Sequence, residues 1–471
     1  MAKFDLAPVD PDIEPFVRKS AGGSWYSYKG NMLWTEQTSD EAQAEAILSH
    51  ELSHFFVHVA TPYGMLIETL GRLQERFVHR YCAALTEEGS PIQYPVYRFV
   101  QRENAPVHAS LVTEYIRPWS RLVRLERILD GSNVPAVRDA TIPDAVELLA
   151  DMEDLEQAVV IADGGDPADL GERPSFARML DDARDRLAFA PACPRFMPTD
   201  GEESVAGAAA LFEGLALKAE GMVYPDHWGM VNRGMSRDQY LGFQAVVLEK
   251  YGLSRADSQQ DFERFSYTFI ALCDLALQTP IGSMYGKLRP PDCDYRDLHP
   301  GCRFIRLLDD ITDDDWIDSL DDLPGLQKTL SARLGWPDPR LFALHGSAAE
   351  EPDAHSEAMR IRLREPTFHL FPQGELASEF LAAHGPLVRD SQTGEIMPTL
   401  HDRSKLGPVV NYITWRLTWQ VMMGPRVDVN EALPEGIYGR RWWSNIDTKE
   451  DLAEVFFRVV PALNPENFIL T

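Results

Sequence analysis

The feature that most constrains this chain is an H-E-x-x-H motif, His50-Glu51-Leu52-Ser53-His54. Histidines four residues apart lie one above the other on a single face of an α-helix, so both imidazoles can bind one metal ion. A glutamate beside the first histidine can then take a proton from a water molecule held by that ion. The motif therefore predicts a helix that carries a metal site with hydrolytic chemistry.

The surrounding residues predict that the motif lies in the middle of this helix. Residues 38–41 form a typical N-terminal capping sequence, and Pro62 and Gly64 are expected to end the helix, because a residue before proline disfavours helical geometry. Between these limits, apolar residues recur at helical spacing: Ala44, Ile47, Leu48, Leu52, Phe55, Phe56 and Val59. The pattern fits a buried metal site, and it also fits incidental histidines on a partly buried helix.

A catalytic zinc ion takes three protein ligands and keeps one position for water, so a third ligand is needed. His58 continues the four-residue spacing, but three successive turns cannot all point at one ion, and we expect His58 in the core or beside a ligand. Glu213 is the better candidate. It lies in an otherwise apolar predicted helix, from Glu202 to about Met222, where an ionised carboxylate is costly unless it is paired or bound to metal.

Alternatives to this ligand remain open. Glu213 could pair with an arginine, or it could lie with Glu220 on a polar face of its helix. Glu68 and Glu75, on the next predicted helix after the motif, could supply the third ligand instead. Glu203 is expected near the same face as Glu213, where it could orient a ligand histidine through a hydrogen bond.

The H-E-x-x-H segment together with the later Glu213-Gly214-Leu215-Ala216 resembles the gluzincin branch of zinc metallopeptidases. In that group an H-E-x-x-H helix supplies two zinc ligands, and a glutamate on a downstream helix supplies the third. The resemblance covers two short helices. It implies a zincin-like fold and a peptidase that uses Zn²⁺.

Carried over residue by residue, the resemblance makes His50, His54 and Glu213 the zinc ligands and Glu51 the general base. The spacing departs from the family pattern, because Glu213 lies much farther from the motif than usual. Either residues 86–200 are an insertion between the two helices, or Glu75 is the ligand.

The hydrolytic mechanism implied by this site needs a hydrogen-bond donor for the oxyanion of the tetrahedral intermediate, in addition to the metal. Tyr224 and His227 follow the Glu213 helix directly, and both are candidates for this catalytic role. Tyr63, in the turn after the motif helix, is a third candidate. Side chains of these types are more often structural aromatics than catalytic groups.

The overall pattern predicts an α+β fold that is mainly helical. We expect a zincin-like metallopeptidase domain with a small sheet at residues 1–235, followed by a mostly helical C-terminal domain at residues 236–471. Residues 20–36 are predicted to form a hairpin before the motif helix, and residues 93–115 are predicted to form two strands.

Composition narrows the partners and the compartment. The 471 residues include 45 basic and 73 acidic side chains, a net charge of −28, which argues against binding to nucleic acid or to an anionic membrane. The five cysteines are scattered and odd in number, which suits a reducing compartment. No stretch of about 18 apolar residues is present. We therefore expect a cytoplasmic enzyme that cleaves a protein or peptide, with a regulatory protein as a candidate partner. Two alternatives stay open: an interaction or regulatory protein that keeps a zincin-like fold without protease activity, and a zinc hydrolase of a non-peptide bond.

Overall fold

The computed structural model describes most of the chain from the motif helix to about residue 390. The described residues are 25–28, 32–35, 41–94, 96–102, 108–131, 135–162, 164–166, 174–196, 204–223, 259–348, 353–370, 372, 374–390, 418, 422 and 468–470.

The predicted α+β class, with a zincin-like small sheet in the first domain, is wrong, because the described part of the chain is mainly helical and has few residues in strands. The strands that occur are two to four residues long, and none forms a layer on which a domain could be built. The core is made instead by helices packed on helices. The strands are β1 Trp25–Ser27, β2 Met32–Thr35, β3 Ile92–Tyr94, β4 Arg195–Phe196, β5 Ser204–Val205, β6 Leu387–Asp390 and β7 Phe468–Leu470.

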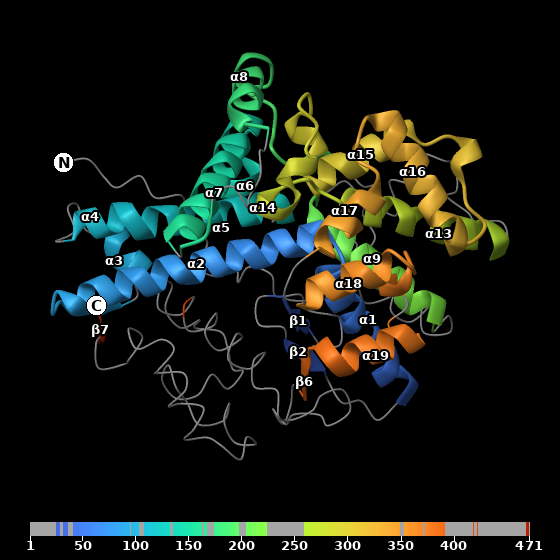
Figure 1. The fold of residues 1–471 in the computed structure, drawn as a ribbon, viewed down its shortest axis with the longest axis horizontal. Helices are drawn as coiled ribbons and strands as arrows, with labels where there is room; N and C mark the ends of the chain where they lie inside the picture. The colour runs from blue at the N-terminus through green and yellow to red at the C-terminus, as the bar shows by residue number, and fades with distance from the viewer. Residues whose placement is uncertain are drawn as a thin grey trace.

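The helices follow one another with short connections through most of the described chain (Figure 1). The α-helices are α1 Glu41–Val59, α2 Pro62–Glu87, α3 Val96–Arg102, α4 Ala109–Leu111, α5 Arg117–Asp130, α6 Pro135–Arg138, α7 Ile142–Ala162, α8 Phe176–Arg186, α9 Ala208–Val223, α13 Gln259–Ala276, α14 Gly282–Tyr285, α15 Pro300–Asp310, α16 Leu323–Leu334, α17 Pro339–Gly346, α18 Ala354–Arg362 and α19 Glu375–His384. The π-helix η1 Val112–Ile116 joins α4 to α5, and the 3₁₀ segments are η3 Gly286–Leu288, η4 Tyr295–Asp297, η5 Asp313–Asp315, η6 Leu320–Asp322 and η7 Phe368–Leu370.

The predicted hairpin before the motif helix is confirmed. Strand β1 pairs antiparallel with β2, with Tyr26 opposite Leu33. Strand β2 also pairs in parallel with β6, from the far end of the described chain, and Leu33 lies opposite Val388. The hairpin places Tyr26 and Tyr28 against α1, and their hydroxyl groups contact histidines of that helix.

The two strands predicted at residues 93–115 are not formed. Only β3 is extended, and the chain then enters α3, while the second predicted stretch, from His108 to Tyr115, forms α4 and most of η1. Apolar residues in this region, Tyr97 and Val100 among them, are buried against other helices. Packing onto a helical core has overridden the β-propensity of these aromatic and β-branched residues.

The second half of helix α1 is buried, and this burial explains its apolar sequence. All residues from 49 to 60 are buried, so this part of the helix is enclosed by its neighbours, which include α2, α9, α18, η7 and the strands β1 and β2. Helix α9 packs along α1, and α13 packs on α9. One hydrophobic core runs through these elements and through α5, α7 and α15.

The end of α1 and the start of α2 fall where proline and glycine predict them. Thr61 caps α2 and accepts a hydrogen bond from the Gly64 amide at 3.2 Å, and Pro62 occupies the first turn. A Cβ atom on Gly64 would lie 1.7 Å from the carbonyl oxygen of His58, so only glycine allows the two helices to meet this closely.

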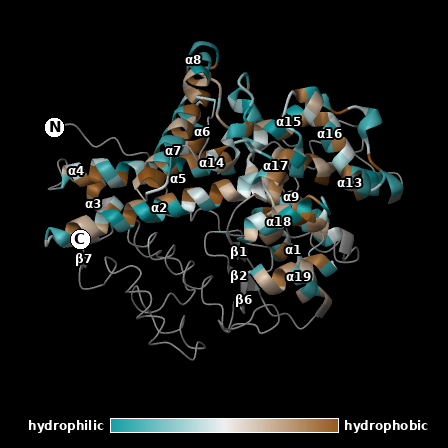
Figure 2. Ribbon diagram, viewed as in Figure 1, coloured by the Kyte–Doolittle hydropathy of each residue, from teal (hydrophilic) through white to brown (hydrophobic). Residues whose placement is uncertain are grey.

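Hydrophilic residues gather on the outer parts of the helices, for example at the outer end of α8 (Figure 2). Among the described helices, none combines the length and apolar character that crossing a bilayer requires. The boundary predicted near residue 235 falls between α9 and α13, outside the described residues, so the division into two domains and the insertion at 86–200 stay predictions.

Candidate metal centre

Helices α1 and α9 bring His50, His54 and Glu213 together. One ligand atom from each residue lies within 4.8 Å of the other two. The Nε2 atoms of His50 and His54 are each 3.4 Å from the same carboxylate oxygen, Oε2 of Glu213. The sequence predicted these three residues as one site, and the structure places them side by side.

The spacing of these atoms suits a metal ion better than a pair of direct hydrogen bonds. Ligand atoms about 2.0–2.2 Å from a tetrahedral zinc ion lie about 3.4 Å from one another. A charged N–H···O bond would be shorter, at about 2.7–2.9 Å. Among the described residues, no hydrogen-bond donor reaches Oε2 of Glu213. Two imidazoles and a carboxylate are also a donor set that zinc accepts, so the residues fit the ion that the resemblance implies.

The site lies inside the protein. His50, His54 and Glu213 are 2%, 1% and 4% exposed. Burial alone would lower the pKa of His50, but the nearby carboxylates of Glu213 and Glu220 outweigh it and raise the pKa well above its usual value. Burial would raise the pKa of Glu213, but the two histidines hold it well below its usual range. The pocket thus stabilises positive charge, as a cation site must.

Glu220 orients the first histidine. Its Oε2 lies 3.0 Å from Nδ1 of His50, on the opposite side of the ring from Glu213. A carboxylate on the far nitrogen of a ligand histidine fixes the ring and raises its basicity. The alternative in which Glu213 and Glu220 lie on a polar face is wrong, because both are buried. Residues seven positions apart share one face of a helix, so the sequence predicts a shared face for Glu213 and Glu220. In the structure this face points into the core.

Two tyrosines of the hairpin contact the histidines on α1. The hydroxyl of Tyr28 lies 3.3 Å from Nδ1 of His54, and that of Tyr26 lies 3.2 Å from Nδ1 of His58. Residues two apart along an extended chain and four apart along a helix advance by similar distances, roughly 6–7 Å, which allows the two pairs to form in register. The sequence did not predict either tyrosine.

His58 belongs to the core, as expected. It is 5% exposed and packs edge-on against the Tyr28 ring. Burial, with the nearby His355, lowers its pKa to about 3, so the ring is neutral at physiological pH. It is not part of the three-residue cluster.

Glu51 is fully buried beside the cluster. Its negative charge helps to raise the pKa of His50, so its carboxylate acts on the site electrostatically. This is the position that a general base requires, next to the first histidine of the motif. Its catalytic role stays a prediction.

The other predicted residues divide into two groups. Glu68 is partly exposed and pairs with Arg72, and neither Glu68 nor Glu75 joins a metal-ligand cluster among the described residues. Tyr63 is buried, and its ring packs on Phe212. The remaining candidates lie outside the described residues: Tyr224, His227 and Glu203.

The sequence around Glu213 explains how α9 approaches its neighbours. A Cβ atom on Gly214 would lie 3.0 Å from the ring of Phe269 on α13, so glycine lets α13 pack closely. On the other side, Phe212 packs against Tyr28. Helix α9 therefore packs on both α1 and α13, and the carboxylate of Glu213 is directed at the two histidines.

Comparison of the chain with protein-family models, with curated proteins and with solved structures finds no match.

Proposed function

We propose that this chain is a zinc-dependent hydrolase that cleaves peptide bonds. The observation that carries the proposal is the convergence of His50, His54 and Glu213 from two helices, with their ligand atoms within 4.8 Å of one another. The buried Glu51 beside this cluster supports a catalytic rather than a structural site, because a structural zinc has no need of a base. Structural sites also fill all four positions with protein ligands, commonly cysteine, and no cysteine joins the cluster among the described residues.

In the proposed reaction, Glu51 would transfer protons, and Glu220 and Tyr28 would orient the two histidine ligands. A zinc ion, when bound, supplies the Lewis acidity that brings the pKa of a water molecule toward neutrality. Glu51 would accept the proton of the attacking water and later deliver it to the leaving amine. Glu220 would hold the ring of His50 and Tyr28 that of His54, so that both Nε2 atoms face Glu213.

One observation favours a second candidate, a zinc hydrolase of a small non-peptide substrate. The three candidate ligands and Glu51 are each exposed by 4% or less. An extended peptide has to lie along a cleft that reaches the metal, whereas a small molecule needs only a narrow passage. A peptidase built on this site would have to open before its substrate could bind.

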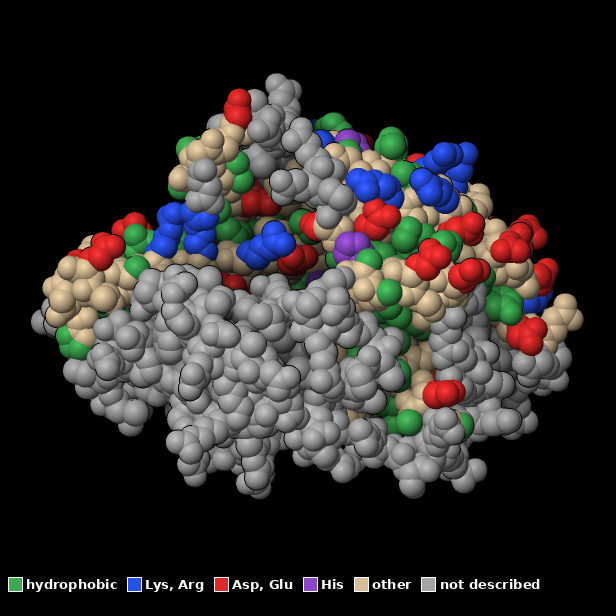
Figure 3. All heavy atoms as spheres, turned by 60° about the horizontal axis from the view of Figure 1, so that its bottom comes forward, with side chains coloured by type: hydrophobic (Ala, Val, Ile, Leu, Met, Phe, Trp, Pro, Cys, Tyr) green, Lys and Arg blue, Asp and Glu red, His purple; other side chains and the backbone are tan. Residues whose placement is uncertain are grey.

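We propose a cytoplasmic enzyme whose substrate is a peptide or a protein and whose activity a regulatory protein controls. All five cysteines are free, and four of them are buried, as in proteins of reducing compartments. On the face shown in Figure 3, basic and acidic side chains of the described residues are interspersed and do not form a continuous basic patch. This supports a partner other than nucleic acid.

The test is hydrolysis by the zinc-loaded protein of a fluorogenic peptide library and, in parallel, of small ester and amide substrates. Glu51→Gln should retain zinc but lose about 10²–10⁴-fold in rate, which is the contribution of a positioned base. Glu68→Gln, on the surface of α2, is the matched control and should leave the rate unchanged. Turnover of both substrate classes that survives in Glu51→Gln would contradict the proposal, and turnover of the small substrates alone would favour the second candidate.

A further inference from the structure

The last carbonyl groups of the motif helix are held by side chains from a distant part of the chain. The last carbonyls of an α-helix have no partner within the helix. The Val59 oxygen lies 2.8 Å from Nδ1 of His355, and the Ala60 oxygen accepts a hydrogen bond from Nη1 of Arg362 at 2.6 Å. His355 and Arg362 both lie on α18, about 300 residues later in the sequence.

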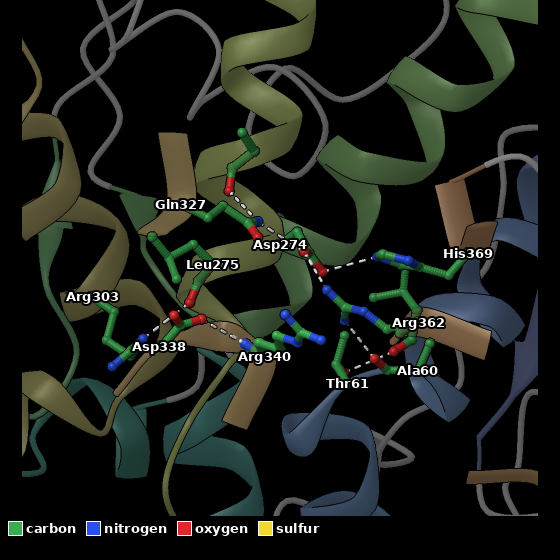
Figure 4. Close-up of polar contacts among 12 residues, drawn as sticks. Ala60, Thr61, Asp274, Leu275, Arg303, Gln327, Asp338, Arg340, Arg362 and His369 are labelled. Atoms are coloured by element: carbon green, nitrogen blue, oxygen red, sulfur yellow. Dashed lines mark hydrogen bonds and ion pairs between the residues drawn. The ribbon is translucent and has the colours of Figure 1, made fainter. Parts of the chain in front are cut away.

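Each of these two side chains is fixed by a buried partner of its own. Arg362 donates from Nη2 to Asp274 on α13, at 2.7 Å. Asp274 also accepts from Gln327 at 2.9 Å, and its other oxygen lies 3.0 Å from Nε2 of His369 (Figure 4). Arg362 therefore cannot move without disturbing a network that joins α13, α16, α18 and η7.

The hydrogen bonds of His355 have a defined direction. Burial lowers the pKa of His355, so the ring is neutral and carries one proton. A carbonyl can only accept, so that proton is on Nδ1 and points at Val59. Nε2 must then accept, and the hydroxyl of Tyr285 donates to it at 2.6 Å. This chain of bonds ties α14 to the same end of α1.

We infer that Arg362 and His355 are positioning residues for the proposed metal site and act through α1. His54 is five residues before Val59, about 7.5 Å along the helix axis. A metal site tolerates errors of only about 0.5 Å in the placement of its ligands. The charge of Arg362 also suits the negative end of the α1 dipole. The inference rests on the proposed metal site. It means that two residues from the second half of the chain hold the helix that carries the histidine ligands in place.

The experiment measures two quantities in the full chain: Zn²⁺ affinity, by competition with a chromophoric chelator, and hydrogen exchange of the amides of α1. Arg362→Gln should weaken Zn²⁺ binding about tenfold, within the range of couplings carried by packed networks, and should speed exchange near Val59. Arg362→Lys keeps the charge but has a single donor nitrogen, so it cannot span both partners as the guanidinium does, and it should recover part of the affinity. His355→Gln tests the second contact separately.

The matched control is Arg289→Gln. Arg289 forms a similarly buried pair with Glu153 of α7, with side-chain exposures of 1% and 9%, and among the described residues no hydrogen bond or ion pair joins Arg289 directly to α1. Loss of general stability would therefore appear in both variants, whereas loss of Zn²⁺ affinity should appear only in Arg362→Gln.

The outcomes separate the two levels of the proposal. Normal Zn²⁺ affinity in Arg362→Gln and His355→Gln, with wild type binding zinc, would overturn the positioning role and leave the metal site intact. Equal losses in Arg289→Gln and Arg362→Gln would also overturn it. A wild-type chain that binds no zinc would remove the metal site itself, and the positioning role with it. The visible spectrum of the Co²⁺-loaded protein gives a further readout, and distorted ligand geometry in Arg362→Gln alone would support the role.

Discussion

Replacing Asp274 by asparagine should lower the free energy of unfolding by about 3–5 kcal/mol, the usual cost of removing one partner of a buried ion pair. The carboxylate is fully buried, and the Arg362 side chain is 6% exposed, so solvent cannot replace the lost charge. Asparagine has the same shape but only one acceptor oxygen. In Asp274, one carboxylate oxygen accepts from Arg362 and Gln327 and the other lies against His369, and asparagine can replace only one of these two oxygens.

The pH dependence of this effect has a definite sign. Burial alone would raise the pKa of Asp274, but Arg362 and His369 outweigh it, and the net effect holds the pKa well below its usual range. A carboxylate with a depressed pKa stabilises the folded protein above its unfolded pKa of about 3.9, and that stabilisation is lost as the pH falls below it. The difference between wild type and Asp274→Asn should therefore be full at pH 7 and should shrink below about pH 4.

The assay is urea denaturation followed by far-UV circular dichroism, with Arg362→Met and the double variant completing a double-mutant cycle. The double variant should lose less free energy of unfolding than the sum of the two single variants, because it leaves no unpaired charge buried. Glu357→Gln, which removes a half-exposed pair with Arg360 on α18, is the control and should cost less than about 1 kcal/mol. A cost below about 1 kcal/mol for Asp274→Asn, or strictly additive effects, would refute the reasoning.

Three further predictions concern the site and its helices. Glu220→Gln should weaken Zn²⁺ binding by about 10–100-fold, because His50 loses the carboxylate that orients it; chelator competition measures this, and unchanged affinity would argue against the role. Burial lowers the pKa of Lys218 to about 7, so between about pH 7 and 10.5 the unfolded chain binds more protons and stability should rise with pH. Lys218→Met should therefore raise the free energy of unfolding by about 2–4 kcal/mol at pH 7 and by little near pH 10.5. An equal increase at both pH values in urea titrations would contradict this. Gly64→Ala should cost about 3 kcal/mol or more in the same titration, because its Cβ would overlap the His58 carbonyl, and a wild-type midpoint would show that the turn can relax.

The motif helix could be predicted because its signals are local. Apolar spacing, together with Pro62 and Gly64, predicted α1 and the start of α2 within a few residues. Glu213 could be predicted because a carboxylate in an apolar helix needs a partner, and the structure gives it two histidines. Both inferences depend on a single helix at a time.

The rest depends on contacts between distant segments. Glu220 was assigned to a possible polar face, because one helix alone does not reveal which side is buried. The residues after β3 have strand-like composition, but their burial against neighbouring helices decides their structure. Arg362 and Asp274 follow no periodic pattern that links them to α1, so the bonds from Arg362 to Ala60 and to Asp274 could be found only from the folded chain.

The most direct test of the account is the zinc content of the purified chain, measured by elemental analysis in wild type, His50→Ala and Glu213→Ala. We expect about one zinc ion per wild-type chain, with loss in both variants, because three ligands from two helices are needed for a catalytic site. Zinc retained in Glu213→Ala would contradict the assignment of the third ligand. Wild-type protein that takes up no zinc, even after reconstitution, would contradict the metal site itself.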